Sequence, residues 1–155
     1  MDVLISPNDL LSSKSEQVKV PLTPEDSSLM DDMFRYVKEH EGEAVGLSAV
    51  QVGSAKRMCA IRFRDGLGKL VSYKLANPRI VWHSGESSVG EEGCLSVPGP
   101  HSNVRRWSSV KVMAYDAMQG RNVVINASGF LSRVLQHEID HMDGILISDK
   151  TKENK

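Results

Sequence analysis

The sequence predicts one α+β domain, in which antiparallel β-sheets pack around a central helix and another helix lies near the N-terminus. Two segments show the spacing of apolar residues that is typical of amphipathic helices. Between them lie several short segments of alternating hydrophobicity, separated by Gly, Pro, Ser or Asp. The regular helix–strand alternation of a doubly wound sheet is missing. The 155 residues suit a single domain, 1–155, which ends in a polar tail over residues 148–155.

The first helix has a clear start signal. Thr23 is a typical N-cap residue, Pro24 suits the first helical position, and acidic residues follow in the first turn. Apolar residues then recur at helical spacing up to about His40. Gly42 is expected to end this helix.

The middle of the chain is predicted to form strands. A turn over residues 116–120 is expected to join the last two strands into a hairpin. The expected strands cover residues 57–63, 70–75, 79–83, 110–115 and 122–126.

The second helix is expected to begin after Ser128 and to end at Gly144. Its apolar positions are Phe130, Leu131, Val134, Leu135 and Met142.

Composition excludes several classes of protein. The net charge is -1 and the pI is about 6.5, which gives no reason to expect nucleic acid or an anionic membrane as a ligand. Apolar runs are far shorter than the roughly 20 residues of a membrane span. The N-terminal residues resemble neither a signal peptide nor a transit peptide, so a cytoplasmic location is expected. Of the two cysteines, Cys59 lies between apolar residues and is interpreted as part of the core.

The second helix contains an HExxH pattern, which carries the chemistry. His137 and His141 are four residues apart, so they lie on one helix face and can bind the same metal ion. Glu138 lies between them in angle, and its carboxylate can reach a metal-bound water. The pattern predicts a metal-dependent hydrolase with Glu138 as general acid/base but does not identify the substrate. A polar helix face that happens to carry two histidines is the alternative.

A catalytic site of this kind usually has a third protein ligand. Metzincin proteases place a histidine at the position that Ile147 occupies here, and Ile147 cannot coordinate a metal. The thermolysin-like arrangement needs a glutamate on a later helix, and few residues follow His141. The ligand is therefore expected upstream, and Cys94 is the best candidate because a thiolate binds zinc or ferrous iron well.

Three segments of the chain resemble, in order and spacing, the signature motifs of the peptide deformylase family. The family pattern GxGxAAxQ corresponds to residues 44–51, with Ala44 and Ser48 as departures. EGCLS is complete at residues 92–96, and QHExDHxxG is complete at residues 136–144. The resemblance covers residues 7–147 and implies the peptide deformylase fold. The chain is more similar to the short deformylases of some bacteriophages than to members with a C-terminal ribosome-docking helix, so docking by that route is not expected.

The resemblance also implies a function. Deformylases remove the formyl group from the N-terminal formyl-methionine of nascent chains and release formate. One divalent ion per chain would be bound by Cys94, His137 and His141, with Fe²⁺ as the native ion and Ni²⁺, Co²⁺ or Zn²⁺ as substitutes. A metal-bound hydroxide attacks the formyl carbonyl, and Glu138 transfers the proton to the leaving amine. The Gln51 side chain and the Leu95 backbone N–H would stabilise the oxyanion.

The residues expected to contact the substrate follow from the same resemblance. Val45, Gly46 and Gly93 would line the peptide cleft, and Phe130 and Val134 would form the methionine pocket, unless these two belong to the core. Members of the family commonly carry an arginine that helps to orient the peptide, and His101 aligns with it here. Arg105 and Arg106 lie nearby in the sequence, and which of the three residues contacts the substrate stays open. Arg133 falls in the helix turn that usually walls the methionine pocket, which predicts a different side-chain preference.

Two other functions were considered. A small HExxH metallopeptidase would need a different third ligand, and Ile147 and the complete EGCLS motif argue against it. A catalytically inactive, metal-stabilised family member would be expected to lack part of the machinery, and all of these side chains are present.

Overall fold

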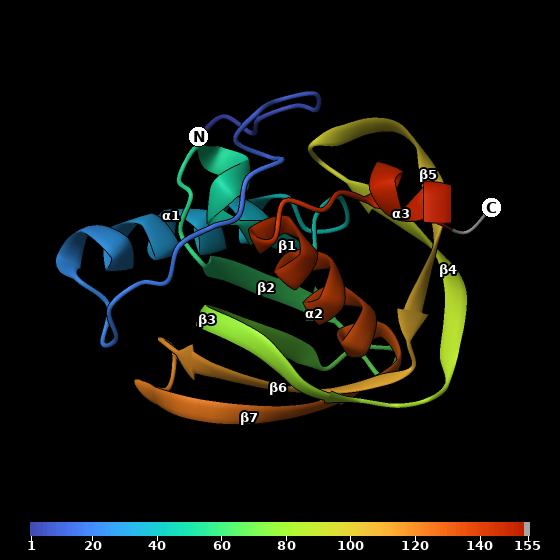
Figure 1. Ribbon diagram of the computed structural model, residues 1–155. Helices are drawn as coiled ribbons and strands as arrows, with labels where there is room; N and C mark the ends of the chain where they lie inside the picture. Colours follow the sequence, from blue (N-terminus) through green and yellow to red (C-terminus); the bar gives the residue numbers. More distant parts are fainter. Residues whose placement is uncertain (154–155) are drawn as a thin grey trace.

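The computed structural model describes residues 1–153 of the chain and has the predicted α+β architecture (Figure 1). A five-stranded antiparallel sheet has the order β1-β2-β3-β6-β7, and β4 and β5 form a separate two-stranded sheet. The strands are β1 (Gly46–Ser48), β2 (Met58–Arg64), β3 (Leu70–His83), β4 (Ser87–Cys94), β5 (Val97–Trp107), β6 (Ser109–Asp116) and β7 (Arg121–Ser128). The helices are α1 (Pro24–Glu39), the 3₁₀ helix η1 (Ala49–Val52), α2 (Gly129–Met142) and α3 (Ile147–Glu153).

Helix α2 lies across one face of the large sheet (Figure 1), and α1 packs on the opposite face. Strand β2 shows why, because successive side chains of a strand point to opposite faces. Cys59, Ile61 and Phe63 belong to the core cluster under α2, whereas Met58 and Ala60 belong to the cluster under α1. The expectation that Cys59 is a core residue is therefore confirmed, since it is 1% exposed.

Helix α1 begins as predicted and ends at Glu39, where His40, rather than Gly42, is the C-cap residue. The Thr23 hydroxyl accepts a hydrogen bond from the Asp26 backbone N–H at 3.2 Å, which satisfies one of the free donors at the helix start. Met30, Met33 and Val37 are the buried apolar residues of this helix. They fix it against β1 and β2.

The two strands predicted over residues 70–75 and 79–83 form one continuous strand, β3, so their separation was wrong. Asn77 interrupts the ladder with a positive φ of 54°, and the register to β6 shifts between Ala76 and Arg79. The Asn77 side chain compensates by pairing with the backbone N–H and C=O of Val18, at 2.9 and 2.8 Å. Asn-Pro therefore marks a β-bulge here rather than a chain reversal.

The hairpin of β4 and β5 was not predicted, and β5 includes the segment Pro98–Gly99–Pro100. β4 is rich in Ser, Gly and Glu and lacks the alternation of a half-buried strand. Its order comes from pairing with β5 along its length, from Ser87 opposite Trp107 to Cys94 opposite Val97. Only a two-residue turn, Leu95–Ser96, separates the two strands.

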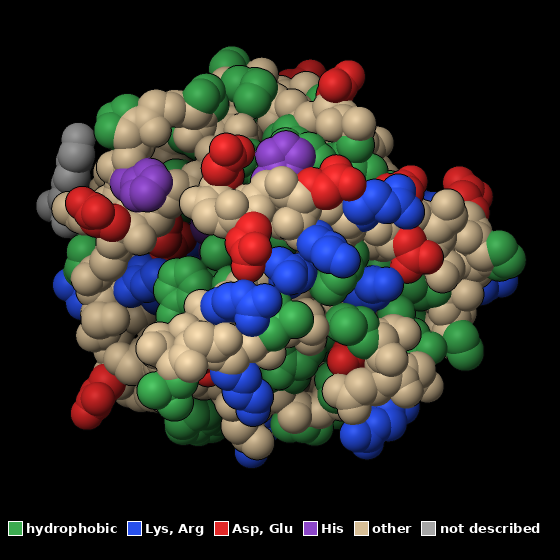
Figure 2. Space-filling model, turned by 180° about the vertical axis from the view of Figure 1, so that it is seen from behind, with side chains coloured by type: hydrophobic (Ala, Val, Ile, Leu, Met, Phe, Trp, Pro, Cys, Tyr) green, Lys and Arg blue, Asp and Glu red, His purple; other side chains and the backbone are tan. Residues whose placement is uncertain are grey.

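The C-terminal segment also differs from expectation. Most of the predicted polar tail forms helix α3, and residues 154–155 lie outside the described part. Ser128 is the N-cap of α2 as predicted, although its side chain makes no capping hydrogen bond. Within residues 1–153, no helix is both long and apolar enough to cross a membrane. The face seen in Figure 2 mixes Lys and Arg with acidic and hydrophobic side chains.

Candidate metal centre

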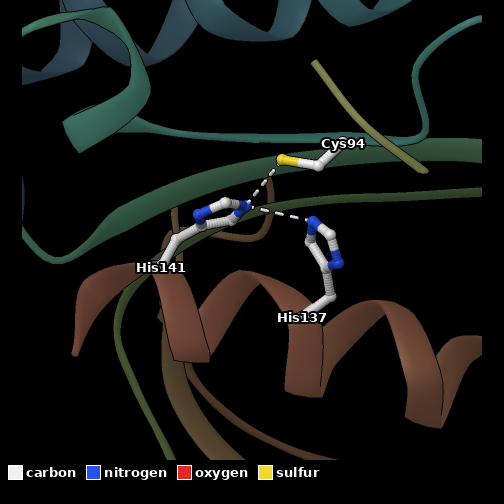
Figure 3. A group of neighbouring side chains, drawn as sticks. All are labelled: Cys94, His137 and His141. Carbon is white, nitrogen blue, oxygen red and sulfur yellow. Dashed lines mark hydrogen bonds between the residues drawn. The ribbon is translucent and has the colours of Figure 1, made fainter. Parts of the chain in front are cut away.

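The structure brings the three predicted metal ligands together (Figure 3). His141 Nε2 lies 3.0 Å from His137 Nε2 and 3.4 Å from Cys94 Sγ. The three ligand atoms all lie within 4.8 Å of one another. Two imidazoles and one thiol therefore direct their donor atoms to one point, from segments more than 40 residues apart in the chain.

Local structure explains this convergence. His137 and His141 lie one turn apart in the C-terminal half of α2, whose other face is fixed by core residues. Cys94 is the last residue of β4, immediately after a register shift between Glu92 and Cys94. Such an irregularity redirects a side chain at the end of a ladder. The thiol consequently points at the helix.

The surroundings of the centre favour a cation. Burial opposes protonation of His137, but hydrogen bonds with Cys94 and Glu92 outweigh burial and raise the pKa of His137 to about 10. The pKa of His141 is lowered well below its usual value, through burial and through the charge of His137. One positive charge is thus favoured in the centre, and a divalent ion would replace the proton, as metal binding to His and Cys does. The donor set fits such an ion.

Glu92 was not singled out from the sequence, yet it organises the centre. Its Oε1 accepts hydrogen bonds from His137 Nδ1 at 2.9 Å and from Arg106 Nη2 at 2.8 Å. Its Oε2 accepts from Arg106 Nε at 2.9 Å and from Arg133 Nη1 at 2.7 Å. By holding Nδ1, Glu92 leaves Nε2 of His137 free for a metal. The signal in the sequence was its place in EGCLS, two residues before the ligand.

Glu138 lies beside the centre and is nearly inaccessible, with 3% of its side chain exposed. Its Oε2 accepts a hydrogen bond from the Ser48 hydroxyl at 2.8 Å, and its Oε1 lies 3.9 Å from His137 Nε2. Burial raises the pKa of Glu138, which suits a group that must both take up and release a proton. A Cβ at Gly46 would lie 3.0 Å from Oε1, so a larger residue at this position would press against the carboxylate.

Gln51 and Leu95 lie at the same centre. Gln51 is 2% exposed, and its Oε1 accepts a hydrogen bond from the Ser48 backbone N–H at 2.9 Å. This contact orients the amide, so that Nε2 points to Ser96 Oγ at 3.1 Å and to Cys94 Sγ at 3.7 Å. Leu95 follows the cysteine in the turn between β4 and β5. Both residues line the cavity that opens at the metal centre.

This cavity has a volume of about 520 Å³ and contains the residues predicted to contact a substrate. Val45, Gly46, Gly93, Phe130 and Val134 all line it. Phe130 is 54% exposed, so it is not a core residue, whereas Val134 is 5% exposed and serves both the core and the cavity wall.

The structure distinguishes the three candidates left open for orienting a peptide. His101 lines the cavity, and its ring covers Gly93 so closely that a Cβ there would lie 2.7 Å from it. Arg106 is buried and bound to Glu92 and Asp140. Arg105 donates to Ser87 Oγ and lines a different cavity. Of the three, only His101 faces the metal centre.

Comparisons with known proteins agree with this geometry. The sequence profile of polypeptide deformylases matches residues 1–155. A peptide deformylase of Symbiobacterium thermophilum is 41% identical over 150 residues, which cover 97% of this chain and 66% of that protein. The crystal structure of a probable peptide deformylase from Synechococcus phage S-SSM7 has a TM-score of 0.86 at 33% identity, covering 97% of this chain and 99% of the phage chain.

A third match is the Met-Ala-Ser-bound structure of a class I type b peptide deformylase from Acinetobacter baumannii. Its TM-score is 0.86 at 30% identity, and the match covers 97% of each chain. Family profile, sequence identity and fold therefore agree over nearly the whole length, and the chain belongs to the polypeptide deformylase family.

Proposed function

We propose that this chain hydrolyses the N-formyl group of formyl-methionyl peptides, with Cys94, His137 and His141 as ligands of one divalent metal ion. Family membership identifies the chain as a deformylase-type metal-dependent hydrolase, and the matches do not favour a metallopeptidase or an inactive member. The observation that carries the residue assignment is the convergence of the three donor atoms beside the buried carboxylate of Glu138.

The metal would supply Lewis-acid activation of the attacking water and of the formyl carbonyl. We propose Fe²⁺ as the native ion, with Ni²⁺, Co²⁺ or Zn²⁺ as substitutes, because two imidazoles and a thiolate suit all of these ions. Ferrous iron and its thiolate ligand are both sensitive to oxygen. An enzyme prepared without oxygen is therefore expected to be more active than one prepared in air, whereas equal activity would indicate zinc or nickel.

Glu138 would move the proton. Its Oε1 accepts a proton from the attacking water and delivers it to the amine as the formyl C–N bond breaks, which gives formate and a free N-terminus. The Ser48 hydroxyl holds the other carboxylate oxygen and so fixes the orientation of Oε1. The Gln51 amide and the Leu95 backbone N–H would donate to the negative charge that develops on the formyl oxygen.

The substrate would bind in the cavity as an extended peptide beside Val45, Gly46 and Gly93. The structure of the Acinetobacter deformylase contains bound Met-Ala-Ser. In this chain, the methionine side chain of a substrate would lie against Phe130 and Val134, which line the cavity. His101, which lies over Gly93, would contact the peptide backbone. These contacts provide an apolar pocket with a few polar groups, as is typical of small-ligand sites.

Formylated nascent chains are proposed as the partners, which implies a cytoplasmic location. Nucleic acid and membranes are not expected as ligands, since the net charge is -1.

The test is formate release from formyl-Met-Ala-Ser, with the metal content measured on the same sample. Activity should follow the metal content, disappear with a chelator and return on adding back Fe²⁺ or Ni²⁺. Acetyl-Met-Ala-Ser is a control for general amide hydrolysis. A fully metal-loaded protein that releases no formate would contradict the proposal.

A further inference from the structure

Among the described residues, Arg133 is the one Lys or Arg side chain that α2 contributes to the cavity wall. Phe130, Val134 and His137 line the cavity from the same face of the helix, at the spacing expected for neighbours on one face. The first two offer apolar surface, and His137 belongs to the metal centre. Arg133 therefore lies within the wall of the proposed side-chain pocket, where a charged residue would not be expected.

The guanidinium of Arg133 is held in a fixed position between α2 and the β4–β5 hairpin. Nη1 donates to Glu92 Oε2 at 2.7 Å and to the Val104 carbonyl of β5 at 2.8 Å. Nη2 donates to the Ser88 carbonyl of β4 at 3.0 Å. Only 13% of the side chain is exposed. A flexible surface arginine would move aside for a ligand, but this one is tied to both strands and to a buried carboxylate.

Gly90 shows that the guanidinium fills the space between helix and hairpin. A Cβ at Gly90 would lie 3.0 Å from Cζ of Arg133, which is closer than ordinary van der Waals contact. Arg133 lines the cavity whereas Gly90 does not, so the Arg133 side chain lies between the cavity and Gly90. Arg133 and Gly90 together form a barrier at the side of the cavity, because the glycine leaves room for the guanidinium.

We propose that Arg133 is a specificity-determining residue that closes the side-chain pocket and thereby limits the length of the first substrate side chain. The inference rests on the proposed function, because it concerns the side chain next to the formyl group. An unbranched substrate side chain that is longer than the pocket must displace the guanidinium, which donates hydrogen bonds to three acceptors. Each further methylene then brings no favourable burial and disturbs the contact with Glu92.

The test compares kcat/KM for formate release from formyl-X-Ala-Ser peptides, where X is methionine, norleucine, 2-aminoheptanoate or 2-aminooctanoate. Ratios between substrates for one variant do not depend on the fraction of active enzyme. For the parent, kcat/KM should fall steeply beyond norleucine. Arg133→Leu should remove most of this fall. Relative to the parent, its kcat/KM should gain about fourfold for each added methylene that becomes buried. Arg105→Leu, a matched loss of an arginine outside this cavity, should keep the length profile of the parent.

A second variant tests the barrier from the other side and keeps Arg133 and its charge. Gly90→Ala adds a methyl group behind the guanidinium, which should move toward the cavity and make the length limit sharper, opposite to the effect of Arg133→Leu. An active parent whose length profile is the same in both variants would overturn the inference while leaving the proposed function intact. A parent without formate release from any peptide would overturn both.

Discussion

Replacing Glu92 by glutamine tests whether this carboxylate organises the metal centre. The side chain keeps its shape, but one acceptor oxygen becomes an NH₂ donor and the negative charge is lost. Four N–H groups now point at the two oxygens of Glu92, from His137, Arg106 and Arg133. In Glu92→Gln at least one of these donors must face another donor, and Arg106, which is 4% exposed, loses its principal counterion.

The size of the effect follows from this burial. Breaking a buried ion pair by removing one partner costs about 3–5 kcal/mol, and the remaining contact of Arg106 with Asp140 places the expected loss near 3 kcal/mol. Loss of the carboxylate that orients a metal-binding histidine typically weakens metal affinity by about 10- to 100-fold. Glu92→Gln should therefore be less stable and bind Zn²⁺ more weakly, even though all three ligands are intact.

The pH dependence provides an independent readout. Burial alone would raise the pKa of Glu92, but hydrogen bonds from Arg106 and His137 outweigh it and hold the pKa well below its usual value. A carboxylate with a lowered folded-state pKa stabilises the protein above its unfolded pKa of about 4.3, and this stability is lost as the pH falls through the folded pKa. The difference in unfolding free energy between parent and Glu92→Gln should therefore be largest at neutral pH and shrink in acid.

The measurements are urea unfolding of the metal-free proteins between pH 3 and 7, and competition with a chromogenic chelator for Zn²⁺. Arg105→Leu is the control for loss of a nearby charge outside the network. Equal unfolding free energies at pH 7 together with an unchanged Zn²⁺ affinity would refute the reasoning, because the four hydrogen bonds would then contribute nothing measurable.

Three further predictions concern the centre itself. Glu138→Gln should keep its metal but lose at least about 10²-fold in kcat, because the proton carrier is lost. Without metal, this variant should unfold at a higher urea concentration than the metal-free parent at pH 7. The reason is that burial raises the pKa of Glu138, so its ionised form destabilises the fold. Cys94→Ser should lower the metal content measured after dialysis, since a hydroxyl is a poor ligand at neutral pH; undiminished metal would require another third ligand. Gln51→Leu should reduce kcat by about 10²- to 10³-fold with unchanged metal content, and a change confined to KM would exclude a role at the oxyanion.

The elements with strong local signals could be predicted from the sequence. Thr23 and Pro24 set the start of α1, and the spacing of apolar residues set α2. The β4–β5 hairpin could not be predicted in this way, because β4 is ordered by contacts with β5 and α2 rather than by its own residues. The continuity of β3 through Asn77 could not be predicted either, because the compensating partner Val18 lies 59 residues away.

The same distinction applies to the candidate site. HExxH is a local pattern, so His137, Glu138 and His141 could be placed on one helix face from spacing alone. The third ligand depends on a strand end whose position is fixed by tertiary contacts, and its assignment needed the resemblance to a family. The role of Glu92 depends on two arginines, 14 and 41 residues further along the chain, that only the fold brings to it.

Ser48 shows how one departure from the family pattern acquires a structural role. The pattern has alanine at this position, and alanine would leave Oε2 of the buried Glu138 without the 2.8 Å hydrogen bond that it accepts here. This bond favours the ionised carboxylate, whereas burial favours the neutral acid, and burial is the larger of the two effects. The same residue donates its backbone N–H to Gln51, at 2.9 Å. Ser48 therefore couples the orientation of the proposed proton carrier to that of the proposed oxyanion donor, because a shift of this short strand would displace both side chains together.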